Sequence, residues 1–190
     1  MKSDTYKEYI APIVVLVSIC LVMSACLAIV YGITKPIIDE NTKKNADATR
    51  AMVLAEADGF TPYEGELVVE KEGSVYAEEV YTANNGAGIV ATVKTKSFGG
   101  ALTMMVGVNA AGEVTGVSVT DHADTPGLGT RDFEEAYLAQ YNGLAKLNST
   151  SVKDDGQIAY ISGASVSGSA VHYGVYTALH QFEQMGGVQG

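Results

Sequence analysis

The sequence contains little cysteine and no tryptophan. Its two cysteines, Cys20 and Cys26, both lie in one apolar run near the N-terminus. Residues six apart on a helix point about 240° from each other, so this pair cannot form a disulfide within the chain. We therefore interpret both as small apolar packing residues. The rest of the chain has no thiol for a disulfide, a thiolate metal site or a CxxCH haem attachment.

Basic residues are also scarce, with 12 Lys and Arg against 22 Asp and Glu, for a formal net charge of −10. Nucleic acid is excluded as a partner because binding phosphates needs a basic face. The sequence has no Gly-x-Ser-x-Gly elbow, no Walker loop and no Gly-x-Gly-x-x-Gly fingerprint, which disfavours a hydrolase or a nucleotide-hydrolysing enzyme. The three histidines, His122, His172 and His180, do not form a metal-binding set, so we expect no metal.

One uncharged run stands out against this background. Residues 10–33 would span roughly 36 Å as a helix, enough to cross a lipid bilayer with some tilt. A cleaved signal peptide is one alternative, and a lipoprotein box at residues 23–26, with Cys26 as the lipid acceptor, is another. We favour an uncleaved anchor, because the run is longer than a signal h-region and continues beyond Cys26. Residues 1–9 would then form a cytoplasmic tail.

After the span, residues 34–59 read as a polar stalk helix. Pro36 suits a first helical turn or a kink, and Asp58-Gly59 provides a stop. From residue 60 onward, apolar residues recur at every second position, which predicts antiparallel strands. Residues 60–190 are therefore expected to be an α+β domain of strands flanked by helices. The expected strands are Glu66–Glu70, Val75–Tyr81, Ile89–Lys96, Leu102–Val108 and Val114–Thr120, and the expected helices are Asp132–Tyr141 and Ser167–Met185.

Two segments of the domain carry candidate chemistry. Four hydroxyls and two glycines gather at 162–169, where the last helix begins, and a helix N-terminus favours an anion such as phosphate. Simple N-capping by Ser165 or Ser167 is the alternative. The second segment is a Pro-Gly loop that follows a strand, and its glycines allow close approach of a ligand. Taken alone, it is equally explained as a plain surface turn, which is the alternative. It consists of Asp124, Thr125, Pro126, Gly127, Leu128 and Gly129.

Together these segments resemble the FMN-binding domains of the Rnf G subunits and of the sodium-pumping quinone reductases. Ser162-Gly163-Ala164-Ser165 is similar to the flavinylation motif, which implies a phosphoester between FMN and the Ser165 hydroxyl, with Ser167 nearby. The loop at 124–129 resembles the family's Thr-Pro-Gly-Leu-Gly loop beside the flavin. Phe98-Gly99-Gly100 resembles its aromatic-Gly-Gly turn. Serine replaces the more usual threonine at 165, and Ala159 stands where the motif usually has Asp.

The resemblance, which covers nearly the whole chain, implies a component of a membrane-bound, ion-translocating ferredoxin–NAD oxidoreductase. Such a component relays electrons through covalent FMN, has no catalytic residues of its own and does not bind NAD. Its partners would be other membrane subunits, including a second flavinylated one, and a flavin transferase. The resemblance places residues 34–190 outside the cytoplasm, although more basic residues follow the span than precede it.

Three alternatives remain open. The first is the C subunit of the sodium-pumping quinone reductase, whose chains are usually longer. The second is a stand-alone flavinylated lipoprotein for electron transfer outside the cytoplasm, for which Cys26 is the discriminating residue. The third is a flavin-free extracytoplasmic binding module, in which the serine cluster would only cap a helix.

Overall fold

The structure is a computed structural model that describes residues 10–127 and 129–187. The chain divides into two compact units, Met1–Ala46 and Asp47–Gly190. The predicted cytoplasmic tail, residues 1–9, lies outside the described residues.

Helix α2 extends from Ala11 to Val53 and contains Pro36 within it. The proline therefore does not end the helix. The turns that follow it are supported by i,i+4 ion pairs from Lys35 to Asp39 and from Lys44 to Glu40. This helix is apolar and long enough to cross a membrane. Its most apolar stretch of 18 residues is not buried within the protein. It ends at Val53, so residues 54–59 of the predicted stalk are not helical.

The second unit contains a six-stranded antiparallel sheet, which confirms the predicted α+β class. The strand order is β1-β3-β4-β5-β6, and β2 also pairs with β3. The expected strands are found, most of them with ends within one or two residues, but β1 was not predicted. The strands are β1 Phe60–Pro62, β2 Val69–Lys71, β3 Val75–Ala83, β4 Gly88–Lys96, β5 Ala101–Asn109 and β6 Val114–His122.

The helical segments follow the sheet in sequence. They are η2 Gly129–Phe133, α3 Glu135–Leu138, η3 Ala139–Tyr141, α4 Val152–Asp155 and α5 Ser165–Gln184. The single helix expected at 132–141 is wrong. Glu134 has an extended backbone, with φ −67° and ψ 141°, which divides the segment into short turns. These turns direct Asp132, Tyr137 and Tyr141 into the interior.

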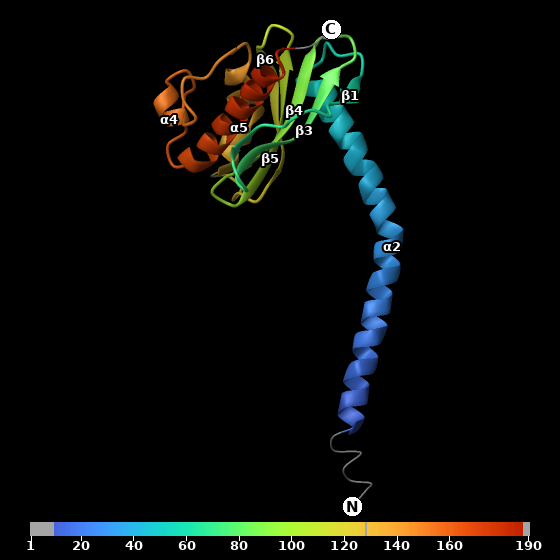
Figure 1. The fold of residues 1–190 in the computed structure, drawn as a ribbon. Helices are drawn as coiled ribbons and strands as arrows, with labels where there is room; N and C mark the ends of the chain where they lie inside the picture. Colours follow the sequence, from blue (N-terminus) through green and yellow to red (C-terminus); the bar gives the residue numbers. More distant parts are fainter. Residues whose placement is uncertain (1–9, 128, 188–190) are drawn as a thin grey trace, which may run out of the picture. The chain divides into compact units, whose positions relative to one another are not determined.

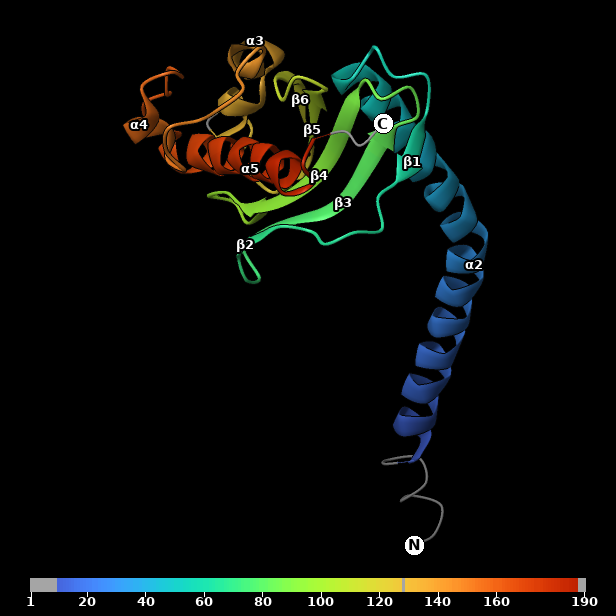
Figure 2. The ribbon, with the colours of Figure 1, turned by 45° about the horizontal axis from the view of Figure 1, so that its top comes forward.

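The sheet is covered on both faces. Helix α5 crosses one face (Figures 1 and 2), where it packs on the apolar side chains of Ile89, Ala91 and Val93 in β4. The intervening residue Val90 points to the other face and is also fully buried. The last turn of α2 packs there, with Val53 against β5 and β6. Strand β4 is therefore apolar on both sides.

Two paired glycines make this second packing possible. Gly107 of β5 lies opposite Gly116 of β6, and the backbone of Val53 lies against both. The Thr115 hydroxyl donates a hydrogen bond to the Val53 carbonyl. Glycine is required at 107 because a methyl group there would overlap the backbone carbonyl of Val53, which cannot rotate away.

We expect Gly107→Ala to lower the free energy of unfolding by about 1–3 kcal/mol through overpacking. Gly116→Ala is the matched comparison, because its methyl group would be 3.0 Å from the Val53 Cα and needs a smaller shift. Denaturant unfolding of the detergent-solubilised chain measures both. Equal effects at 107 and 116 would contradict this account of the packing.

Candidate functional site: a serine at a helix N-terminus between two cavities

Helix α5 begins at Ser165 without a side-chain cap. Gly163 supplies a left-handed turn at φ 92°, and Ala164 is the N-cap residue, with no side-chain hydrogen bond to the helix. The alternative in which Ser165 or Ser167 caps this helix is therefore wrong. The amides of the first turn have no partner along the helix, so this end remains suited to an anionic oxygen.

A cavity of about 170 Å³ joins the two predicted motifs at this end of α5. Its walls come from the loop after β6, the turn between β4 and β5, and the start of α5. The lining residues are Phe98, Asp124, Thr125, Gly129, Gly163, Ala164, Ser165, Val166 and Ser167. Segments that are well separated in sequence thus meet around one hydroxyl-bearing helix end.

Asp124 holds the loop against the turn. It is 5% exposed and accepts hydrogen bonds from the Ser97 hydroxyl, at 3.0 Å, and from the Gly99 amide. Gly99 must lack a side chain because its Cα faces the backbone carbonyl of Ala123. Gly100 has a φ of 137°, a conformation that side chains rarely adopt. The Phe98-Gly99-Gly100 turn is therefore shaped by its contact with the loop.

The other predicted site residues that the structure describes do not line this cavity. Ser162, Pro126 and Gly127 are exposed, and the Gly127 amide donates a hydrogen bond to the Thr130 hydroxyl at 2.9 Å. Leu128 lies outside the described residues.

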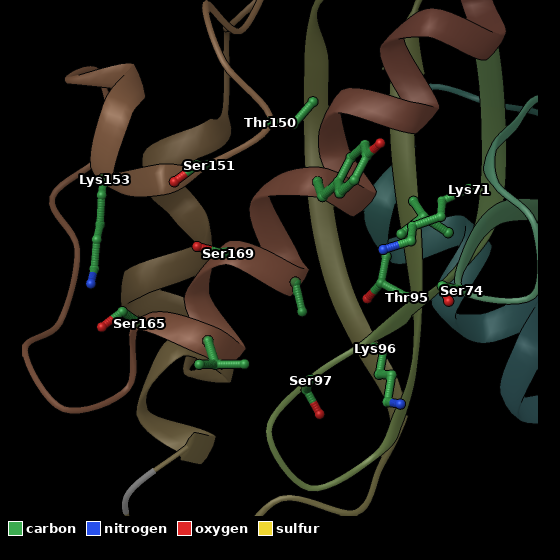
Figure 3. Close-up of a pocket in the computed structure, with 14 residues that line it drawn as sticks. Lys71, Ser74, Thr95, Lys96, Ser97, Thr150, Ser151, Lys153, Ser165 and Ser169 are labelled. Atoms are coloured by element: carbon green, nitrogen blue, oxygen red, sulfur yellow. The ribbon is translucent and has the colours of Figure 1, made fainter.

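A larger groove of about 640 Å³ opens on the other side of Ser165. Its 14 lining residues include three lysines and no carboxylate (Figure 3). Ser165 and Val166 line both the groove and the smaller cavity, so the two spaces are adjacent. The lysines, Lys71, Lys96 and Lys153, were missed in the sequence because they are far apart in the chain and belong to no motif.

Beneath the first turn of α5 lies a buried carboxylate. Asp132 is 0% exposed, and neither of its oxygens has a well-formed hydrogen bond among the described residues. Burial raises the pKa of Asp132 to about 6, against the opposing effects of the Gly168 amide and Arg131. The nearby carboxylate of Asp124 raises it further. No pattern in the sequence indicated this buried acid, since the segment was expected to be one continuous helix.

The chemistry of this helix end fits an anionic group such as a flavin phosphate. The helix end is uncapped, and the Ser167 hydroxyl, which is 1% exposed, has no hydrogen-bond partner among the described residues. Ser165 is half-buried at the junction of the two cavities, which leaves its hydroxyl accessible. Within the described ranges, no group of three or more His, Cys, Asp or Glu side chains is arranged to hold a metal ion.

Part of this region is similar to a known protein family. Residues 97–180 match the family model described as the FMN-binding domain. The matched stretch lies within the second unit. The matched stretch contains the aromatic-Gly-Gly turn, the Pro-Gly loop and Ser165, which are the parts that surround the smaller cavity.

Curated relatives extend the similarity to most of the chain. The chain is 27% identical over 168 residues to the G subunit of the proton-translocating ferredoxin:NAD(+) oxidoreductase complex of Clostridium ljungdahlii, covering 85% of each chain. It is 27% identical to the G subunit of the ion-translocating oxidoreductase complex of Methanosarcina acetivorans, covering 91% of this chain and 94% of the relative. The G subunit of the Na(+)-translocating ferredoxin:NAD(+) oxidoreductase complex of Acetobacterium woodii is 25% identical, with 90% of each chain covered. The predicted resemblance to the Rnf G subunits is confirmed.

Asp132 should make stability depend on pH. Its folded pKa of about 6 lies above its ordinary value of 3.8, so the native state holds the extra proton between these values. The penalty for the buried charge is therefore absent below about pH 4 and complete above about pH 6, and stability falls as pH rises through this window. We expect Asp132→Asn to make the free energy of unfolding less dependent on pH in this window. At pH 7 the substitution should raise the free energy of unfolding by about 1–3 kcal/mol.

Denaturant unfolding at pH 4, 5, 6 and 7 measures this dependence. Asp154→Asn, an exposed residue of α4, is the control for removing one negative charge. A pH profile for Asp132→Asn that parallels the wild-type profile would contradict the assignment of this group.

Proposed function

We propose that this chain is the flavoprotein subunit of a membrane-bound, ion-translocating ferredoxin–NAD oxidoreductase, and that it relays electrons through an FMN esterified to Ser165. The observation that carries the proposal is the position of the Ser165 hydroxyl, at an uncapped helix N-terminus between two cavities within the FMN-binding segment. The flavin supplies the redox chemistry when bound, and the protein positions it and adjusts its potential.

The chain's own residues would hold the cofactor in three ways. The free amides of the first turn of α5 and the helix dipole stabilise the phosphate charge. The loop at 124–129, pinned by Asp124, forms one wall for the ring, and Phe98 offers an aromatic face that is 77% exposed. The sequence contains no nicotinamide-binding fingerprint, so we assign NAD chemistry to another subunit.

Membership in a larger complex is proposed from the relatives' names, which place those proteins in ferredoxin:NAD(+) oxidoreductase complexes. The partners would be other membrane subunits, including a second flavinylated one, and a flavin transferase would attach the cofactor. Helix α2 would anchor the protein, with residues 10–33 in the bilayer and 34–59 as a stalk. The FMN domain, residues 60–190, would lie on the extracytoplasmic side of the plasma membrane.

The first test of this function removes the proposed acceptor. Ser165→Ala should abolish covalent flavin, because the phosphoester needs that hydroxyl, whereas Ser165→Thr should retain it. Ser169→Ala is the matched control, since Ser169 lines the same groove one turn further along α5. Ultraviolet fluorescence of the denatured proteins in a gel, with intact mass, gives the readout. A Ser165→Ala band as bright as wild type would place the acceptor elsewhere, with Ser167 next to be tested.

The second test concerns sidedness. Ala111 is an exposed residue of the turn between β5 and β6, and its side chain can become cysteine with little disturbance. In a background with Cys20 and Cys26 replaced by serine, Ala111→Cys should react with an impermeant thiol reagent in whole cells. The same background without the new cysteine is the control. Labelling only after lysis would place the domain in the cytoplasm.

A further inference from the structure

The groove beside Ser165 has a charge opposite to that of the chain. The sequence carries a formal net charge of −10, yet the groove presents three lysines and no carboxylate. Among the described residues none of the three lysines forms an ion pair, and Lys153 instead lies 5.8 Å from the centre of the Tyr160 ring. Three exposed lysines without counter-ions repel one another, so a bound anion would stabilise the groove.

A second observation indicates that the groove is shaped to hold a ligand. Thr95, at 3% exposure, lines the groove, and its hydroxyl has no hydrogen-bond partner within the described part of the chain. An unpartnered buried hydroxyl is costly unless a ligand or water satisfies it. Figure 3 shows Thr95, Lys71 and Lys96 on the strand side of the groove, and Ser165 and Lys153 on its helical side.

The volume of the groove is in the range of known cofactor sites. A cavity of about 170 Å³ is smaller than the roughly 300–1,000 Å³ of typical cofactor sites, whereas the groove of about 640 Å³ falls within that range. Val166 lines both spaces and is 55% exposed, although it is apolar. A flavin ring joined to Ser165 through its phosphate chain would lie against Val166, which borders both spaces, and reach into the groove.

We propose that Lys71 and Lys96 hold the negative charge that reduction adds to the flavin, and that they thereby raise its midpoint potential. This inference rests on the proposed function. One electron from an external one-electron donor adds one negative charge to the ring unless a proton is taken up with it. The lysines stabilise that charge through space, so no bond forms or breaks. The two lysines take no part in bond making and only adjust the midpoint potential of the flavin.

The test is a spectroelectrochemical titration of the flavin-loaded full-length protein in detergent. Lys71→Gln and Lys96→Gln should each shift the ratio of reduced to oxidised flavin, at a fixed potential, toward the oxidised form by about threefold, as expected for exposed charge pairs. The double variant should shift it by about tenfold, which corresponds to about 59 mV for one electron. All these shifts should shrink at high salt, because salt screens exposed charges.

Lys146→Gln is the matched control, because Lys146 is exposed and lies outside the groove. Equal potentials in the wild type and the double variant, with flavin still attached, overturn the role of the lysines and leave the proposed function standing. A shift of the same size in the Lys146 variant overturns it as well, since the effect would then be one of total charge. A wild-type preparation without covalent flavin overturns the proposed function and this inference together.

Discussion

The position of helix α5 on the sheet is the constraint on which the site depends. Gly174 allows this close packing, because a side chain there would meet Met104 of β5. Gln181, which is fully buried, accepts a hydrogen bond from the Val68 amide at 2.7 Å and so holds the segment that leads to Lys71. His172 lies 3.0 Å from the Ser149 carbonyl and holds the segment that leads to Lys153. One helix therefore fixes Ser165 and two of the three groove lysines, through side chains that never touch the cavity.

Burial also sets the charge states around this helix. It lowers the pKa of His172, despite the neighbouring carboxylate of Asp155, so the imidazole is neutral when it contacts the Tyr141 hydroxyl at 3.2 Å. Burial would raise the pKa of Asp155, but hydrogen bonds from Gln157 and from the amides of Asn148 and Ser149 outweigh it and lower that pKa. Asp132 has no comparable set of donors, which is why its pKa rises. Asp155 accepts several hydrogen bonds and Asp132 accepts no well-formed one among the described residues. Of the two, only Asp132 lies at the end of α5 that carries Ser165.

The parts of the fold that depend on local pattern could be predicted from the sequence. Alternation located strands β3 to β6, and the Asn109–Gly112 turn between β5 and β6 is closed by a hydrogen bond from Gly112 to Asn109. The parts that depend on tertiary contacts could not. The segment 132–141 looks amphipathic, yet it breaks at Glu134 because its polar and aromatic side chains enter the core. The flavin motifs were recognisable as contiguous residues, whereas the lysine groove is assembled from β2, β4 and α4, and no local pattern signals such a juxtaposition.

Covalent attachment suits the shape of this site. The smaller cavity cannot enclose a flavin. The groove has the volume of a cofactor site but is bordered by three exposed lysines, so part of the ring would stay in contact with solvent. The phosphoester proposed at Ser165 would keep the flavin in place without a high binding affinity. An electron relay needs the ring close to solvent or to a partner's cofactor, and a ring lying in this groove would meet that need. The same openness leaves the charge of the reduced ring to be balanced by exposed groups, and in this chain the lysines of the groove are the cations in position to do so.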